Sequence, residues 1–357
     1  MSWRRLLLTL AASLTILMSV VGLSNVAHAN PNPVSVPPKE GPKVVLGDTS
    51  IDGPAILTTY QPATALAWTG TDALHHLNLM TSSDGLKYGN KHILAETSLW
   101  RPALAFIDTG RGAPYGTIVI AWTGTDANHT LNVAFIKTPE YTVTRKITFW
   151  GEWSFTAPAL ATINGDVNSD IYLSWAGTDP AHTVNVMHMS TNPEKFDKHI
   201  LWGWSSVSRP NLAMDHSYTG AADQSPLILS WTGVNHRIYF AGTTDRVHWT
   251  MAPGSPLSMQ TAWAPTMIGF HAPGLPDHWL AWTGSGTTNS QRINVQYTQH
   301  YPAWSDTNSK TTLVEWAISS PALTYNGDGT TGEVLLAWTG VDYYHHLNVA
   351  AITLATH

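Results

Sequence analysis

One phrase recurs six times along this sequence of 357 residues. It is clearest as ALAWTGTDALHHLNL, VIAWTGTDANHTLNV and LLAWTGVDYYHHLNV, and a tryptophan marks each copy. The six tryptophans are Trp68, Trp122, Trp175, Trp231, Trp282 and Trp338. Successive copies lie 54, 53, 56, 51 and 56 residues apart, a period typical of solenoids and propellers. The sequence therefore predicts a repeat protein, and these tryptophans, each within an apolar run, are expected to pack in its core.

Each repeat contains four short segments with the character of β-strands. The first begins at a proline, where a strand needs no N–H group. The second is the apolar run that ends in Trp-Thr-Gly, and a turn leads from it into the third, as at residues 77–79. A fourth follows a second turn, as at residues 91–94. Because no segment shows a helical period, we expect an all-β fold, a six-bladed β-propeller of four-stranded blades. The opening prolines are Pro54, Pro102, Pro158, Pro210, Pro265 and Pro321.

The two ends of the repeat region complement each other. The sixth repeat stops after its third strand, at residues 347–354. Residues 43–50 (KVVLGDTS) match the fourth strand of the first repeat at 91–98 (KHILAETS). An N-terminal strand is therefore expected to complete the last blade, which would close the ring and remove its unpaired edges.

The N-terminus has the pattern of an export signal. Arg4 and Arg5 precede an apolar run over residues 6–23, and Ala-His-Ala follows at 27–29. This predicts a signal peptide over 1–29 and a secreted or extracytoplasmic protein without membrane association after cleavage, with an uncleaved anchor as the alternative. The chain has no cysteine, which fits bacterial export. Proline-rich residues 30–42 are expected to form a spacer before a propeller over 43–357.

Charge and motifs exclude several functional classes. The sequence holds 18 Lys and Arg against 24 Asp and Glu, a net charge of −6, without a basic run, which argues against nucleic acid as a partner. Each repeat offers one Asp and one or two His with no third donor, so no metal site is expected. Phosphate-loop, hydrolase and zincin motifs do not occur, and no cofactor is predicted.

Strand order places the hairpins between second and third strands on the same face as the crossovers between blades. Tryptophan rings stack on pyranose faces, and Asp and Asn bond to hydroxyls, so this face is expected to bind glycans. The alternative is that the Asp and Asn side chains only stabilise each hairpin as Asx turns. The predicted ligand-binding residues are Asp72, His75, Asp126, His129, Asp179, His182, Asp342 and His345 in the hairpins, and Trp100, Trp153, Trp204, Trp263 and Trp316 in the crossovers.

The turns between third and fourth strands carry a family resemblance. Residues 82–88 (SSDGLKY), 190–196 (STNPEKF) and 243–249 (TTDRVHW) look like degenerate Asp-boxes. The sequence thus resembles the sialidase-like (BNR, Asp-box) six-bladed β-propeller superfamily. This resemblance implies that the Asp-box turns are structural and lie opposite the ligand face, in agreement with the face chosen above.

The resemblance also raises an enzymatic alternative, an exo-acting glycoside hydrolase of sialidase type. Such an enzyme needs arginines for a carboxylate, a tyrosine nucleophile and an acidic partner. The candidates are Arg101, Arg209, Arg292, Tyr343, Tyr344 and Glu96, with Glu152 or Glu315 as substitutes for the last. Repetition of one polar triplet on four blades instead favours a lectin with several sites, because an enzyme needs one asymmetric pocket.

A third class is a protein-interaction scaffold. A central funnel with three arginines would indicate an enzyme, equivalent pockets between blades a lectin, and a flat apolar patch a scaffold. We expect a secreted, monomeric, carbohydrate-binding propeller whose partners are glycans or glycoconjugates.

Overall fold

A computed structural model describes residues 37–60, 63–163, 170–191, 194–215, 226–270, 276–285, 291–298, 304–306, 310–327 and 332–354. The predicted signal peptide and most of the predicted spacer lie outside these residues. All regular elements in the described ranges are β-strands. This part of the chain contains no helix that is long and apolar enough to cross a membrane.

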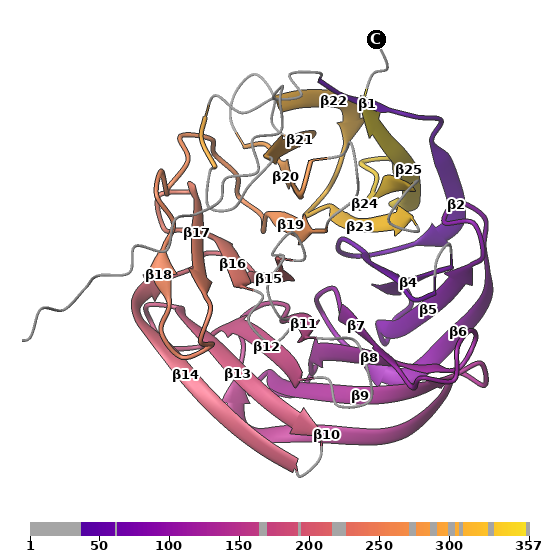
Figure 1. Ribbon diagram of the computed structural model, residues 1–357. Helices are drawn as coiled ribbons and strands as arrows, with labels where there is room; N and C mark the ends of the chain where they lie inside the picture. The colour runs from indigo at the N-terminus through magenta and orange to yellow at the C-terminus, as the bar shows by residue number, and fades with distance from the viewer. Residues whose placement is uncertain are drawn as a thin grey trace, which may run out of the picture. The chain divides into compact units, whose positions relative to one another are not determined.

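The strands form six antiparallel sheets, which are the blades of one ring (Figure 1). Blade 1 consists of β3 (Ala55–Thr58), β4 (Thr64–Thr69), β5 (His76–Ser82) and β6 (Tyr88–Thr97). Blade 2 consists of β7 (Ala103–Asp108), β8 (Gly116–Thr123), β9 (Thr130–Thr138) and β10 (Thr142–Trp153). Blade 3 consists of β11 (Ala159–Ile163), β12 (Asp170–Ala176), β13 (Thr183–Thr191) and β14 (Glu194–Ser205).

Blades 4 to 6 follow the same plan. Blade 4 consists of β15 (Asn211–Met214), β16 (Leu227–Thr232), β17 (Ile238–Thr243) and β18 (Thr250–Met251). Blade 5 consists of β19 (Thr266–Gly269), β20 (His278–Thr283), β21 (Arg292–Thr298) and β22 (Lys310–Trp316). Blade 6 contains β23 (Ala322–Gly327), β24 (Gly332–Thr339) and β25 (His346–Leu354), joined by β1 (Pro38–Glu40) and β2 (Val44–Thr49).

The inner strands close the circle. Contacts run from β3 to β7, β7 to β11, β11 to β15, β15 to β19, β19 to β23, and from β23 back to β3. Each inner strand therefore touches the inner strands of the two neighbouring blades, which confirms the predicted six-bladed propeller.

The N-terminal strand completes blade 6, as predicted. In β2, Val45 pairs with Asn348 and Thr49 with His346. The same register joins β6 to β5 in blade 1, where residues 93 and 97 face 78 and 76. The sheet also begins earlier than residue 43. Pro38–Glu40, which we predicted to be part of the spacer, pairs with β25 as β1, because its extended backbone reaches the free edge beyond β2.

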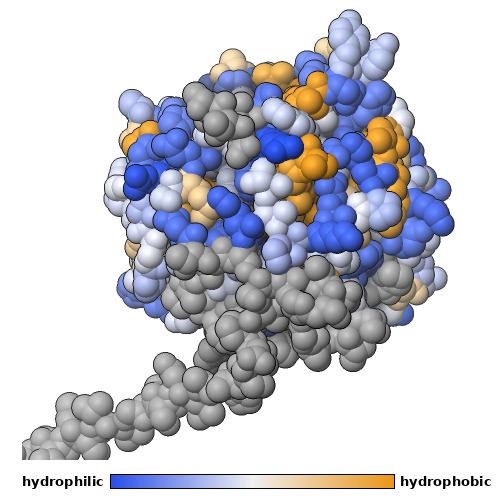
Figure 2. Space-filling model, turned by 90° about the horizontal axis from the view of Figure 1, so that it is seen from above, coloured by the Kyte–Doolittle hydropathy of each residue, from blue (hydrophilic) through white to orange (hydrophobic). Residues whose placement is uncertain are grey.

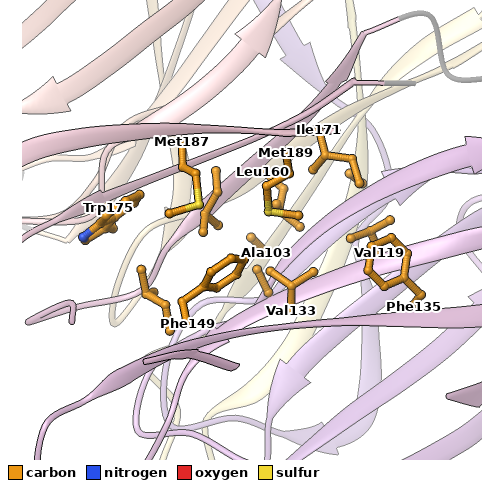
Figure 3. Close-up of a cluster of buried hydrophobic side chains, with 14 of the residues drawn as sticks. Ala103, Val119, Val133, Phe135, Phe149, Leu160, Ile171, Trp175, Met187 and Met189 are labelled. Atoms are coloured by element: carbon orange, nitrogen blue, oxygen red, sulfur yellow. The ribbon is translucent and has the colours of Figure 1, made fainter. Parts of the chain in front are cut away.

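Apolar side chains from adjacent blades pack into shared clusters. Between blades 2 and 3, Val133 and Phe149 share one cluster with Leu160, Met187 and Trp175 (Figure 3). The repeated tryptophan of each blade is at most 2% exposed, which confirms its predicted place in the core. The blades are therefore held together mainly by burial of apolar surface between sheets.

A lysine on the outer strand covers the buried tryptophan in blades 1 to 3. Lys146 Nζ lies 5.2 Å from the ring centroid of Trp122 and 2.5 Å from Glu96 Oε2, a residue of the preceding blade. Lys91 and Lys198 stand in the same way over Trp68 and Trp175, and they pair with acids of the preceding blades. These contacts link neighbouring outer strands around part of the rim.

Candidate functional site

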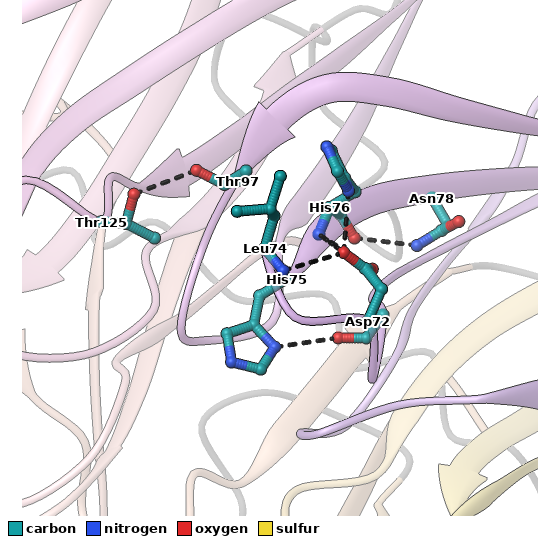
Figure 4. Close-up of polar contacts among 8 residues, drawn as sticks. Asp72, Leu74, His75, His76, Asn78, Thr97 and Thr125 are labelled. Atoms are coloured by element: carbon teal, nitrogen blue, oxygen red, sulfur yellow. Dashed lines mark hydrogen bonds and ion pairs between the residues drawn. The ribbon is translucent and has the colours of Figure 1, made fainter.

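The hairpin geometry, which recurs from blade to blade, explains the repeated Asp, His and Asn. In blade 1, Asp72 Oδ1 accepts the N–H of Leu74 at 3.1 Å and lies 2.8 Å from His76 Nδ1 (Figure 4). Asp72 Oδ2 accepts the N–H of His76 at 3.2 Å, and Asn78 donates to the carbonyl of the same residue at 2.8 Å. The carboxylate therefore holds the turn that connects β4 with β5.

The hairpins of blades 2, 3 and 6 repeat this network. Asp126 and Asp179 accept bonds from Thr130 and Thr183 in the place of His76, and Asp342 accepts them from His346. Burial acts to raise the pKa of each of these aspartates, but the hydrogen bonds outweigh it and lower the pKa. The Asx-turn interpretation thus describes what these side chains do within the fold.

The four predicted histidines share a left-handed backbone conformation at the hairpins, and the side chains of His75, His182 and His345 contact the turn glycine. His75, His129, His182 and His345 all have φ between 47° and 57°. His75 Nδ1 lies 3.2 Å from the carbonyl oxygen of Gly70, and His182 makes the equivalent contact. A Cβ at Gly70 would lie 2.7 Å from Asp72 Oδ2, so the glycine of Trp-Thr-Gly makes room for the aspartate.

The five predicted crossover tryptophans occupy three different positions. Trp153 and Trp316 are the last residues of β10 and β22, and more than 40% of each is exposed. Trp204, the penultimate residue of β14, is partly buried; it stacks on buried Trp231 at 5.1 Å and packs against a core cluster. Only Trp100 and Trp263 lie in the connections, each two residues before the proline that precedes an inner strand.

The connections into the blades form a central funnel. It is a cavity of about 330 Å³, and every blade contributes to its wall the residue two positions before the proline. These six residues are Asp52, Trp100, Thr156, Ser208, Trp263 and Ser319. Trp100 and Trp263 belong to connections three blades apart in a ring of six, so they stand on opposite sides of the funnel. The Oγ atoms of Ser208 and Ser319 are buried without a protein partner.

Two of the predicted arginines line the same funnel. Arg101 and Arg209 stand one residue before the prolines, and they are 4% and 6% exposed. Arg101 Nη1 donates to the carbonyls of Ser320 and Pro321, each at 3.1 Å, and Arg209 Nη1 donates to Asn211 Oδ1 at 3.3 Å. Burial lowers the pKa of Arg101 to about 10, and burial with repulsion from Arg101 lowers that of Arg209.

The remaining catalytic candidates do not converge on these arginines. Arg292 lies over the ring of Trp316 at the end of the outer strand β22. Glu96 pairs with Lys146 on outer strands, and Glu152 and Glu315 pair with lysines in the same way. Tyr343 and Tyr344 form an exposed aromatic pair at the blade 6 hairpin, with ring centroids 5.0 Å apart. Among the described residues, the tyrosine, acid and arginine groups of a sialidase-type site are therefore not assembled.

A larger cavity lies on the opposite face, where sequence reasoning predicted no site. It has a volume of about 500 Å³, lies between blades 1 and 2, and is lined by residues that include Tyr60, Asn90 and Tyr141. Asn90 and Tyr141 have φ of 49° and 52°. These residues belong to turns that differ from blade to blade, so the repeat pattern gave no signal for them.

Two turns on this opposite face share one hydrogen-bonding scheme. Asp84 Oδ1 accepts the N–H groups of Leu86 and Lys87, and Asp245 Oδ1 accepts those of Val247 and His248. A hydroxyl two residues earlier completes each turn, from Ser82 and Thr243. These side chains are thus engaged within their own turns.

Comparisons with known proteins identify the fold. No protein-family model matches the sequence, and no curated protein matches it. A fungal lectin from Aleuria aurantia, described as a six-bladed β-propeller with a novel fucose recognition mode, has a TM-score of 0.60 at 8% identity, over 88% of this chain and 97% of the lectin. The NanB sialidase from Streptococcus pneumoniae has a TM-score of 0.53 at 8% identity, over 86% of this chain and 70% of the sialidase.

A third solved structure, a protein of unknown function from Dyadobacter fermentans, has a TM-score of 0.52 at 12% identity, over 89% of this chain and 99% of its own. Similarity at this level of identity concerns the arrangement of the blades. The chain thus has the six-bladed propeller fold that sialidases share with propeller lectins.

Proposed function

We propose that this protein binds glycans and that the central funnel is its sugar-binding site. The observation that carries the proposal is the opposition of Trp100 and Trp263 across a cavity with hydroxyl-bearing walls. Indole rings stack on the apolar face of a pyranose, and hydroxyl groups give or accept the hydrogen bonds that sugars need. A volume of about 330 Å³ is within the range of small-molecule sites.

The free hydroxyls of the funnel strengthen this assignment. Ser208 Oγ and Ser319 Oγ are buried and have no hydrogen-bond partner in the protein. A buried polar atom without a partner is unfavourable, so a ligand that supplies hydroxyl groups would recover that free energy. Structural similarity to a fucose lectin and to a sialidase supports sugar as the ligand class.

The funnel favours one sugar site per chain over equivalent sites on every blade. The hairpin aspartates are already engaged by their own turns. Trp153 and Trp316 lie away from the funnel on outer strands, and Trp204 is packed against Trp231. Trp100 and Trp263 are therefore the two predicted tryptophans that we assign to the ligand.

A protein-interaction scaffold would need a flat apolar patch, and the surface seen in Figure 2 gives this role less support than the funnel gives to sugar binding. Apolar residues appear there as separate patches between polar residues. A stable protein-protein interface usually has a contiguous core with few charged residues.

The test is a glycan array followed by measurement of Kd for the best ligand. Trp100→Ala and Trp263→Ala are each expected to weaken binding about 10- to 100-fold, as the loss of an aromatic stacking platform does. Trp316→Ala is the matched control, because it removes a partly exposed tryptophan outside the funnel, and its Kd should stay unchanged. Equal affinity in all three variants would refute the funnel as the site.

We also propose that the chain is exported with residues 1–29 as a cleaved signal peptide. The supporting observation is the sequence pattern of two arginines, an apolar run and Ala-His-Ala. Mass spectrometry of the protein expressed in a bacterial host should find it outside the cytoplasm with Asn30 as its first residue. Recovery in the membrane fraction with residues 1–29 intact would instead identify an anchor.

A further inference from the structure

Arg101 and Arg209 form a septum on the ring axis between two cavities. Both line the funnel, and both also line a chamber of about 170 Å³ whose other residues come from the inner strands of all six blades. The guanidinium groups therefore stand where the inner strands surround the axis, and each is more than nine-tenths buried.

The charges at this septum do not balance. Asp52 is the only acidic residue among the described residues that line either cavity, against two arginines. Its carboxylate is shared with the backbone, since Oδ2 accepts the N–H of Arg101 at 2.9 Å and Oδ1 that of Gly53 at 2.6 Å. One positive charge is left over near the axis.

The hydrogen bonds of the two arginines are also incomplete. The Nε atoms of Arg101 and Arg209 are both buried, and neither has a partner in the protein. A buried guanidinium group is stable when its N–H groups reach acceptors, and charged donors left unpaired are the most unfavourable kind. An acceptor near both Nε atoms is therefore missing from the protein itself.

The residues around the axis next to the two arginines are mostly apolar, which strengthens the effect of the unbalanced charge. A third cavity on this side is lined mainly by apolar residues of the inner strands, which include Leu57, Leu104, Leu160 and Leu212. Charges interact more strongly in such surroundings than in water, so the repulsion that Arg101 exerts on Arg209 is only weakly screened. The lowered pKa of Arg209, caused by burial and by Arg101, is the expected sign of this repulsion.

We propose that the ring axis holds a small inorganic monoanion, represented by chloride, between Arg101 and Arg209. One negative charge would balance the excess positive charge, and a spherical ion can accept N–H groups from both sides at once. The ion would stabilise the centre of the propeller. This site is independent of the sugar proposed above, because it depends on buried arginines below the tryptophans and needs no glycan.

The first experiment measures thermal stability at pH 7.5 and constant ionic strength, with sodium chloride exchanged for the sodium salt of 2-(N-morpholino)ethanesulfonate, a bulky monoanion. From 5 to 500 mM chloride, the unfolding midpoint of the unaltered protein should rise by about 2–5 °C, as ligand linkage requires. Sodium acetate replaces chloride in a parallel series as a small carboxylate.

Variants identify the residues that hold the ion. Arg209→Met should abolish the chloride response, because Asp52 then balances Arg101 alone, whereas Arg209→Lys should keep part of it. Arg237→Met removes an exposed arginine and is the control, with the full response of the unaltered protein. Loss of the response in the control as well would mean that chloride acts on the surface, and it would overturn the proposal.

The second experiment does not depend on any variant. Crystals of the unaltered protein soaked in sodium bromide should show an anomalous peak on the ring axis within hydrogen-bond distance of both Nε atoms. Absence of the peak, or a midpoint that rises with acetate but not with chloride, would refute an inorganic monoanion at this site. Neither readout involves sugar binding, so failure here leaves the glycan proposal to its own test.

Discussion

Lys198 on β14 places its Nζ 2.5 Å from Glu152 Oε2 on β10, so an ion pair joins the outer strands of blades 3 and 2. The same ammonium group lies 5.3 Å from the ring centroid of Trp175. The lysine thus contacts the preceding blade through its charge and its own blade through the indole. Lys146 and Lys91 repeat this arrangement in the two blades before it.

Lys198→Met should lower the free energy of unfolding by about 1 kcal/mol, the sum expected for a partly exposed ion pair and a cation–π contact. Lys87→Met is the control, because its side chain is 90% exposed and its 3.6 Å pair with Asp84 lies within one turn. Chemical denaturation in low salt and in 1 M salt checks the origin of the effect, since high salt should reduce the difference. An equal loss in both variants would contradict a special role for Lys198.

Gly70→Ala should destabilise the protein by about 2 kcal/mol, because the new methyl group displaces the carboxylate that closes the hairpin. Its Cβ would lie 2.7 Å from Asp72 Oδ2 and 2.8 Å from Asn78 Nδ2. Gly47→Ala is the matched substitution, since nothing lies within 4 Å of a Cβ there. Thermal unfolding of both variants measures the contrast, and a neutral result for Gly70→Ala would show that the turn can rearrange.

Trp204→Ala and Trp202→Ala should differ strongly although the two residues are almost adjacent. Trp204 stacks on Trp231 in a core cluster, and its loss should reduce stability by about 2 kcal/mol. Trp202 is 77% exposed, and its loss should change stability by less than about 0.5 kcal/mol. Urea denaturation would distinguish them. If both variants had the same midpoint, the stacking would contribute nothing measurable.

Glu40 should make the stability of the ring closure, where β1 and β2 pair with β25, sensitive to pH. Burial and the nearby carboxylate of Glu315 raise the pKa of this residue of β1 from 4.5 to about 7, against the attraction of Lys43. The folded protein therefore holds a proton that the unfolded chain releases, so this contribution is complete below about pH 4.5 and is lost as pH rises through 7. Glu40→Gln should leave stability unchanged at pH 4 and raise it at pH 8.5.

The control for this prediction is Glu140→Gln. Hydrogen bonds from its own backbone and from Lys137 lower the pKa of Glu140, so its contribution has the opposite sign. Unfolding midpoints from pH 4 to 8.5 provide the measurement for both variants. If the unfolding midpoint of the control rose at pH 8.5 as much as that of Glu40→Gln, the loss of net negative charge, and not the burial of Glu40, would be responsible.

The architecture could be predicted because the same strand and turn motifs recur in each repeat of the sequence. The tryptophans of the second strands set the period, and the match between residues 43–50 and 91–98 located the closing strand, whose register in the structure is that of β6 in blade 1. Repetition could not show the extra pairing of Pro38–Glu40, since no other blade has an equivalent of β1.

The candidate site was harder to predict, because two physical roles use the same residue types. An aspartate before a turn can bind a sugar or accept the N–H groups of its own hairpin, and Asp72 does the latter. The tryptophans differ by single positions relative to a serine that recurs after the outer strand, with Trp153 one residue before Ser154 and Trp204 two residues before Ser206. Adjacent residues in a strand face opposite sides, so this shift turns the ring of Trp204 toward Trp231 and the core cluster.

Counting from the prolines would have found the funnel. The residue two positions earlier lines it in every blade, and that position holds tryptophan at 100 and 263 only. The excess positive charge on the axis could not be predicted from the sequence. Arg101 and Arg209 are 108 positions apart in the chain, and only the closed ring brings them to one cavity.

The pairing of β2 with β25 determines when the fold can be finished. One partner is among the first segments of the propeller to be synthesised and the other is the last. On the ribosome, blades 1 to 5 can assemble in turn, but the circle stays open until residue 354 has emerged. A nascent chain that stalls or is truncated before β25 therefore leaves β2 and β24 without their partner, and these strand edges are exposed to neighbouring chains.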